Sequence, residues 1–379
     1  MFPFESPSPD FDAFREVLLG ERMPSKVHLV ELGIDYEVMS FISETLMGRK
    51  IPSQEGVVEE KERLFKEGKD VPALAEGEKP YLKSLIEFYY RMGYDYVPVW
   101  IPLAPFSVKS RVTDDTAILS RGKRTWVEER TGVITSWQEF EAFPWDRINL
   151  ELKDYFSFIS EILPEDMKAT VGSTVYEMIG ERLLGWECMF RNLFLKPDLV
   201  KAVFDRWGQV IYKAYKEAIA HDCVGAIFHA DDLGYKKGTM VSPDILRDIV
   251  FPWFKKFAFL THEHGKIYLY HCCGNVARVM EDLIEDVKID GFHAFQDNII
   301  PVWEFKEKYG DRVAALGGVD VDKLARYEQE SLREYVKSIL EKCMPERRYA
   351  LGSGNTVTNY VPVENYLTML EEGLEWRPK

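Results

Sequence analysis

The stretch Lys266–Asn275, KIYLYHCCGN, joins a strand pattern to a pair of metal-binding side chains. Its first half is a run of apolar and aromatic residues, and it ends in a Gly-Asn turn signal. Because side chains alternate between the two faces of a strand, we expect His271 and Cys273 on one face and Cys272 on the other. A His and a Cys placed in this way can bind a soft or borderline metal ion. In the alternative interpretation, the His is hydrogen-bonded at the strand end and both Cys residues pack as small hydrophobes.

Strand and helix patterns alternate along the chain on both sides of this stretch. Strands are predicted at residues 26–32, 94–100, 168–171, 224–230, 266–271, 289–294, 313–317 and 349–352. Helices are predicted at residues 11–20, 36–48, 81–92, 150–162, 174–220, 243–264, 276–286, 302–309, 331–343 and 363–374, with a helix or loop at 56–75. Strands that alternate with helices form a parallel sheet, and eight such strands close a (β/α)8 barrel. The predicted fold is therefore α/β, a single TIM barrel domain over residues 1–379.

Two segments lie outside this barrel pattern. Residues 1–25 are predicted to form an N-terminal tail and helix. Residues 106–145 are predicted to be an insertion after the second strand that contains a β-hairpin, with strands at 125–130 and 133–137 and a turn at Thr131-Gly132.

Composition and charge exclude several classes of function. The chain has 48 basic and 63 acidic residues, a net charge of −15 and a pI near 5.1, which argues against nucleic acid or an anionic membrane surface as a partner. Five Cys residues at uneven spacing favour a reducing, cytoplasmic environment over a disulfide framework. The N-terminus has no signal-peptide pattern, and no apolar run approaches the length of a membrane span.

Polar and aromatic residues follow several predicted strands, where barrels of this kind place their chemistry. Asp231 and Asp232 follow one such strand and could act as a base or as metal ligands, although an Asp in this position can also cap a helix. Glu31 is interpreted either as the acid of the site or as a surface residue, and His293 either as a ligand or as a hydrogen-bonded core residue. The other candidates at the strand ends are Trp100, which could line an aromatic pocket, His229, His271, Cys273 and Asn355.

Four stretches of the sequence resemble the uroporphyrinogen decarboxylase superfamily. They are HADDLGYKKGTMVSPDILRDIVFPWFKKF (229–257), YLYHCCGNV (268–276), AALGGVD (314–320) and LGSGNTVTNYVPVENY (351–366). The resemblance is detailed from Val224 to the C-terminus and looser from Pro24. It implies a single (β/α)8 barrel, and the superfamily contains both decarboxylases and zinc- and corrinoid-dependent methyltransferases.

Departures from the superfamily patterns favour the methyltransferase branch. The decarboxylases have an Arg-rich motif after the first strand and a His in the last Gly-rich turn, whereas this chain has HLVELGIDYEV (28–38) and Ser353. A porphyrinogen with many carboxylates needs cationic groups to bind it. The methyltransferases hold zinc with a His-x-Cys pair, matched here by His271 and Cys273, and a later Cys, whose place is taken by Asn355. The third ligand is therefore expected to be Glu31, Asp231 or Asp232.

The resemblance implies a methyltransferase that moves a methyl group between a small methylated substrate, such as a methoxylated aromatic, and a corrinoid (cobalamin) on a partner protein. Zinc with an open coordination position would polarise the substrate oxygen, as O-demethylation requires. The predicted metal ligands are His271, Cys273 and Glu31, and the predicted catalytic residues are Glu31, Asp231 and Asp232. The predicted substrate-binding residues are Trp100, His229, His293 and Asn355. A cytoplasmic enzyme is expected, and a homodimer stays open.

Three alternatives remain from other classes. One is a metal-free carboxy-lyase of porphyrin biosynthesis, which would decarboxylate uroporphyrinogen with Asp and Tyr residues at the barrel mouth. The second is a barrel that binds a small ligand or a corrinoid protein without catalysis. In the third, His271 and Cys273 have a purely structural role.

Overall fold

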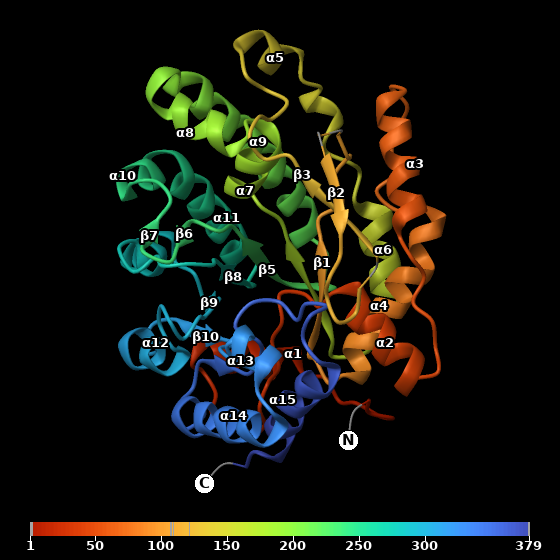
Figure 1. The fold of residues 1–379 in the computed structure, drawn as a ribbon, viewed down its shortest axis with the longest axis vertical. Coiled ribbons are helices and arrows are strands. Elements are labelled where there is room, and N and C mark those ends of the chain that lie inside the picture. The colour runs from red at the N-terminus through yellow and green to blue at the C-terminus, as the bar shows by residue number, and fades with distance from the viewer. Residues whose placement is uncertain (1–2, 107, 109, 121, 378–379) are drawn as a thin grey trace.

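The chain forms the predicted α/β barrel, in which parallel strands are surrounded by helices (Figure 1). The computed structural model describes residues 3–106, 108, 110–120 and 122–377. Seven strands form one sheet in the order β1-β4-β5-β8-β9-β10-β11, and each neighbouring pair is parallel. Their bounds are β1 (Tyr96–Trp100), β4 (Lys168–Gly172), β5 (Val224–Ala230), β8 (Ile267–His271), β9 (Gly291–His293), β10 (Ala314–Leu316) and β11 (Tyr349–Ala350).

The strand predicted at residues 26–32 takes the eighth place in the circle but pairs with the sheet at one position. Leu29 bridges Leu351 in parallel, and the Val30 N–H donates to the Leu351 carbonyl at 2.8 Å. Towards β1, the Tyr96 hydroxyl bonds to both backbone groups of Glu31, with distances of 2.9 Å to the nitrogen and 2.7 Å to the oxygen. A side chain thus joins this segment to β1, which explains why a full strand is absent there.

Helices cover the outer face of the sheet. The main helices are α2 (Tyr36–Leu46), α3 (Glu55–Lys66), α4 (Lys79–Arg91), α6 (Lys153–Ile162), α8 (Trp186–Leu195), α9 (Pro197–Ile219), α11 (Phe251–Glu263), α12 (Val302–Tyr309), α14 (Gln329–Cys343) and α15 (Val363–Glu375). Shorter helices are α1 (Phe11–Leu19), α5 (Trp137–Ala142), α7 (Tyr176–Met178), α10 (Pro243–Ile245) and α13 (Val321–Arg326), with π-helical turns at Ile179–Leu183, Leu246–Val250 and Asp282–Val287. No helix among the described residues is both long and apolar enough to cross a membrane.

Several predicted helices differ from those observed. The helix predicted at 174–220 is divided twice, because Gly185 adopts a φ of +80° between the first π-helical turn and α8, and Lys196 leaves the helical conformation between α8 and α9. The helix predicted at 243–264 contains a π-helical turn between α10 and α11. The helix predicted at 276–286 is largely a π-helical turn, at Asp282–Val287.

The barrel interior is filled by a separate apolar cluster, and α1 covers one end of it. Strand residues such as Tyr96, Phe228 and Leu269 point inward and pack with Phe14 and Leu18 of α1. This packing explains why the N-terminal helix is amphipathic.

A buried polar cluster anchors the same end of the barrel. The Asp95 carboxylate lies 2.6 Å from His28 Nδ1 and 2.9 Å from Lys26 Nζ. It also accepts a hydrogen bond of 2.7 Å from the backbone N–H of Asp10, the N-cap of α1. Because Asp95 immediately precedes β1, the cluster ties α1 to two neighbouring barrel segments.

The insertion after β1 contains a hairpin, but its position was predicted wrongly. Strands β2 (Ser110–Asp114) and β3 (Lys123–Val127) pair in antiparallel fashion, so the turn lies between them rather than at 131–132. The segment predicted as the second strand instead bonds to the π-helical turn after α7, with Ile134 N–H donating to the Leu183 carbonyl at 2.7 Å. Residues 107, 109 and 121 of the insertion lie outside the described part.

Candidate metal centre

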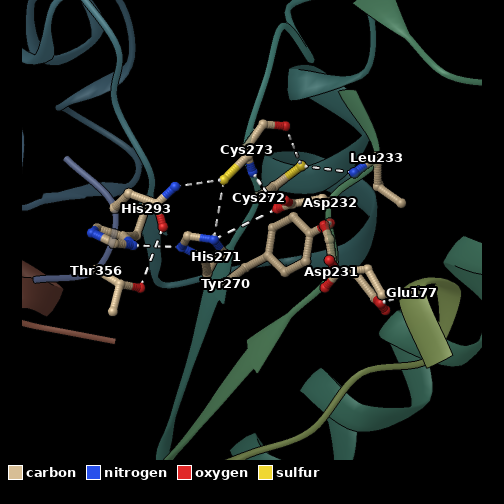
Figure 2. A network of polar contacts seen from close by, with 11 residues as sticks. Glu177, Asp231, Asp232, Leu233, Tyr270, His271, Cys272, Cys273, His293 and Thr356 are labelled. Carbon is tan, nitrogen blue, oxygen red and sulfur yellow. Dashed lines mark hydrogen bonds and ion pairs between the residues drawn. The ribbon is translucent and has the colours of Figure 1, made fainter. Parts of the chain in front are cut away.

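Three potential metal ligands meet at the carboxyl ends of β5 and β8 (Figure 2). The ligand atoms of Asp232, His271 and Cys273 all lie within 4.8 Å of one another. His271 Nε2 is 3.5 Å from Cys273 Sγ and 3.6 Å from Asp232 Oδ1. The structure thus brings together one nitrogen, one sulfur and one carboxylate oxygen.

The alternation of side chains along β8 places His271 as predicted, and Cys273, two residues past the end of the strand, lies beside it. Leu269, two residues before His271, packs in the barrel interior, so His271 faces the same way. The Cys272 thiol is turned elsewhere and accepts a hydrogen bond of 3.2 Å from the Leu233 N–H. His271 itself is buried, with a side chain that is 6% exposed.

A close contact between two loops brings Asp232 to this pair. Gly274 has a φ of +82°, and a Cβ at this position would lie 2.3 Å from the carbonyl carbon of Gly234. Only glycine allows the loop after β8 to approach the loop after β5 so closely. The Cys273 N–H then donates to Asp232 Oδ1 at 2.6 Å, and the Asp232 side chain stays 30% exposed at the barrel mouth.

Two neighbouring residues, His293 and Asn355, contact the candidate ligands His271 and Cys273. His271 Nδ1 lies 2.6 Å from His293 Nδ1, and His293 Nε2 lies 3.1 Å from the Ser353 carbonyl oxygen. On the other side, the Asn355 amide donates to Cys273 Sγ at 3.0 Å. Asn355, which the resemblance was expected to place where the methyltransferases have a later Cys, therefore reaches the site as a hydrogen-bond donor to the sulfur.

Burial shapes the protonation of the site in the metal-free chain. It lowers the pKa of His271 to about 3 and that of His293 well below its usual range, so both imidazoles are neutral at pH 7. It raises the pKa values of the Asp232 carboxyl and the Cys273 thiol. A cation would relieve this penalty on the two anionic ligands, because metal binding favours their deprotonated forms.

The two distances from His271 Nε2 to the other ligand atoms fit zinc. Tetrahedral zinc with ordinary bond lengths places a His nitrogen about 3.6 Å from a Cys sulfur and about 3.4 Å from a carboxylate oxygen. The observed distances from His271 Nε2 are 3.5 Å and 3.6 Å. Three protein ligands also leave the fourth position open, as catalytic zinc sites do.

Glu31, predicted as a metal ligand and catalytic acid, is not part of this group. Its neighbour Val30 packs in the barrel interior, so Glu31 projects from the opposite face of its segment. Its carboxylate accepts hydrogen bonds from the Ser353 N–H at 2.8 Å and the Ser353 hydroxyl at 2.5 Å. Burial raises the pKa of Glu31 to about 8, although these hydrogen bonds act in the opposite direction. Asp232, one of the alternatives to Glu31, supplies the carboxylate beside His271 and Cys273.

His229 and Asp231 lie on the helix-facing side of β5, away from the three ligand atoms. The fully buried Asp231 carboxylate accepts hydrogen bonds of 2.9 Å from the backbone N–H groups of Val175 and Glu177 and lies 2.9 Å from His229 Nε2. His229 Nδ1 lies 3.0 Å from the Tyr215 hydroxyl of α9. These contacts fix the loop after β4, so the geometry gives both residues a supporting position rather than one open to substrate.

Trp100 and Asn355 border open space at the mouth. Trp100 ends β1, is 50% exposed and lines a pocket of about 230 Å³. Asn355 lines a second, polar pocket between the loops that follow β9, β10 and β11. Other residues around this second pocket include Gln296, Asn298, Lys323, Thr356 and Tyr360.

Glu177 was not among the sequence candidates, yet it lies close to the site (Figure 2). Burial raises the pKa of its carboxyl, and the nearby charges of Asp232 and Asp231 raise it further. It is in the first helical turn after β4. Its position shortly after the strand predicted at 168–171 is the feature of the sequence that could have identified Glu177 as a candidate site residue.

Comparisons with known proteins agree with this architecture. A sequence model of the uroporphyrinogen decarboxylase (URO-D) family matches residues 172–376, more than half of the chain. No curated protein sequence matched. A methyltransferase from Methanosarcina mazei has a similar structure, with a TM-score of 0.64 and 15% identity over 95% of this chain and 97% of the other. A B12-independent methionine synthase from a Shewanella species has a TM-score of 0.50 and 12% identity over 79% of this chain and 87% of the other. At these identities the likeness concerns the fold.

Proposed function

The chain belongs to the uroporphyrinogen decarboxylase (URO-D) family, and from this premise we propose that it is a methyltransferase that demethylates a small methylated compound. The methyl group would leave an oxygen of this substrate, such as a methoxylated aromatic, and pass to a corrinoid on a separate protein. In this reaction the C–O bond breaks, the reduced cobalt supplies the electron pair of the new C–Co bond, and the oxygen keeps its own pair and takes up a proton.

The observation that carries this proposal is the group formed by Asp232, His271 and Cys273 at the barrel mouth. Zinc held by these three residues would supply Lewis acidity towards the oxygen atom that loses the methyl group. The chain's residues support that task by their positions. Cys273 N–H orients the Asp232 carboxylate, and Asn355 donates to the Cys273 sulfur and so moderates its negative charge.

One observation favours methyl transfer over decarboxylation. Residues 28–38 contain neither Arg nor Lys, whereas a porphyrinogen with several carboxylates needs cationic groups to bind it.

An anaerobic assay with free cob(I)alamin as the methyl acceptor tests the proposal. The zinc-loaded protein is incubated with a panel of methoxylated aromatics and methylated alcohols, and formation of methylcob(III)alamin is followed by absorbance. We expect methylation of the cobalt with at least one donor and loss of this activity in Cys273→Ala. Cys272→Ala is the matched control, because its thiol is turned away from the ligand atoms and bonds to Leu233.

Two results would overturn the proposal. One is the absence of methylcob(III)alamin with every donor together with turnover of uroporphyrinogen, which would establish the decarboxylase. The other is equal activity of Cys273→Ala and wild type, which would show that the thiol has no part in the reaction.

A further inference from the structure

The carbonyl oxygen of Ser353 fixes the tautomer of His293. A carbonyl oxygen only accepts hydrogen bonds, so His293 Nε2, at 3.1 Å, must carry the proton and donate the hydrogen bond. His293 is fully buried and has no acidic partner in its hydrogen bonds, which keeps its imidazole neutral. A neutral imidazole has one N–H, so His293 Nδ1 is an acceptor.

The same reasoning extends one residue further, to His271. Its Nδ1 lies 2.6 Å from His293 Nδ1, and a hydrogen bond between two ring nitrogens needs one donor. Because His293 Nδ1 accepts, His271 Nδ1 must carry the proton. The unprotonated nitrogen of His271 is then Nε2, which is the atom that faces Cys273 Sγ and Asp232 Oδ1.

We propose that His293 is a positioning residue that sets the tautomer of His271 and so presents His271 Nε2 as a metal ligand. The inference rests on the metal site of the proposed function and names a residue that prepares it. A ligating His commonly donates its other N–H to a fixed acceptor, which orients the ring and strengthens the ligand. In this chain a second imidazole is the acceptor.

Glu31 forms the outer end of this chain of contacts. Its carboxylate accepts two hydrogen bonds from Ser353, one from the backbone N–H and one from the hydroxyl. These bonds hold the residue whose carbonyl accepts the hydrogen bond from His293 Nε2. Glu31 thus acts on the site through Ser353, His293 and His271 in turn, without touching a metal ligand.

The first test is direct observation of the tautomers in the metal-free protein. With the seven His residues labelled with the heavy nitrogen isotope, long-range proton–nitrogen spectra distinguish the two neutral tautomers. We expect His271 to carry its proton on Nδ1 and His293 on Nε2, with signals assigned by comparison with His271→Ala. A proton on His271 Nε2 would overturn the inference, whatever the protein's activity.

The second test measures zinc affinity in two variants of His293. Phe at this position keeps a ring but cannot accept the hydrogen bond from His271 Nδ1, so His293→Phe is expected to weaken zinc binding about 10–100-fold. Gln can accept from His271 and donate to Ser353, so His293→Gln is expected to restore affinity to within a few-fold of wild type. His229→Gln is the matched control, because His229 is equally buried but its ring nitrogens bond to Tyr215 and Asp231 rather than to His271.

The outcomes separate this inference from the proposed function. Equal zinc affinity in wild type and His293→Phe would overturn the positioning role. If His271 carries its proton on Nδ1, His293 carries its proton on Nε2 and zinc binds tightly, the positioning role is supported. If methyl transfer is absent in the same protein, the proposed methyltransferase function is contradicted. If His293→Phe does not fold, the spectra of the wild type and the affinity of His293→Gln still decide.

Discussion

Replacing Glu31 with Gln is expected to flatten the pH dependence of the free energy of unfolding. The Glu31 carboxyl is fully buried, and burial raises its pKa from 4.5 to about 8 despite the hydrogen bonds from Ser353. A carboxyl with a higher pKa in the folded than in the unfolded chain binds more protons when folded. Its contribution to stability is therefore fully present below pH 4.5 and is lost as the pH rises to about 8.

The size of this effect follows from the two pKa values. One pKa unit corresponds to about 1.4 kcal/mol, so Glu31 alone makes the folded chain about 5 kcal/mol less stable above pH 8 than below pH 4.5. Between these limits the slope is about −1.4 kcal/mol per pH unit. Gln has no ionisable group, so the variant lacks this contribution.

Urea unfolding followed by circular dichroism, at each pH unit from 5 to 9, measures the difference between wild type and Glu31→Gln. Both proteins are used without metal, so every other titrating group contributes equally and cancels. The difference in free energy is expected to change by about 4 kcal/mol in favour of the variant across this range. A difference that is constant with pH would refute the burial of an ionisable Glu31 carboxyl.

Three further substitutions test other parts of the structure. Asp95→Asn removes the buried carboxylate that joins α1 to two barrel segments and should lower the free energy of unfolding at pH 7 by about 3–5 kcal/mol; a loss below about 1 kcal/mol in urea titrations would contradict this role. Gly274→Ala should cost about 1–3 kcal/mol and weaken zinc binding measured by titration, because its φ is +82° and its Cβ would overlap Gly234. Gly265→Ala, with a φ of +68° but no atom near the added Cβ, is the control and should leave zinc affinity unchanged. Trp100→Ala should lower the free energy of unfolding by about 1–3 kcal/mol, since half of this large side chain is buried, and should raise KM for the methyl donor; an unchanged KM would contradict a role for Trp100 in substrate binding.

The barrel could be predicted from the sequence because its signals are local. Each strand and helix has its own hydrophobic period, and the observed α12 has the predicted bounds of 302–309. The hairpin could not be placed, because the choice of partner for residues 133–134 depends on contacts with Leu183, about 50 residues further along the chain. Similarly, only the structure shows that the Tyr96 hydroxyl replaces a backbone ladder beside the first segment.

The candidate site divides in the same way. His271 and Cys273 could be identified as a pair because side chains two residues apart in an extended segment lie on the same face. The choice of carboxylate could not be made, because Asp232 reaches this pair only through the close approach of Gly274 to Gly234. The alternation that placed His271 correctly also shows why Glu31 projects from the other face of its own segment.

The metal content of the purified protein, compared among wild type, Asp232→Ala, Cys273→Ala and Glu31→Gln, tests the proposed metal centre most directly. We expect about one zinc per chain in wild type and Glu31→Gln and its loss in the other two variants, because Asp232 and Cys273 are the described residues that form a potential metal site with His271. Zinc retained in Asp232→Ala but lost in Glu31→Gln would contradict the ligand set, and the absence of metal from every form, even after incubation with zinc, would contradict the metal centre itself.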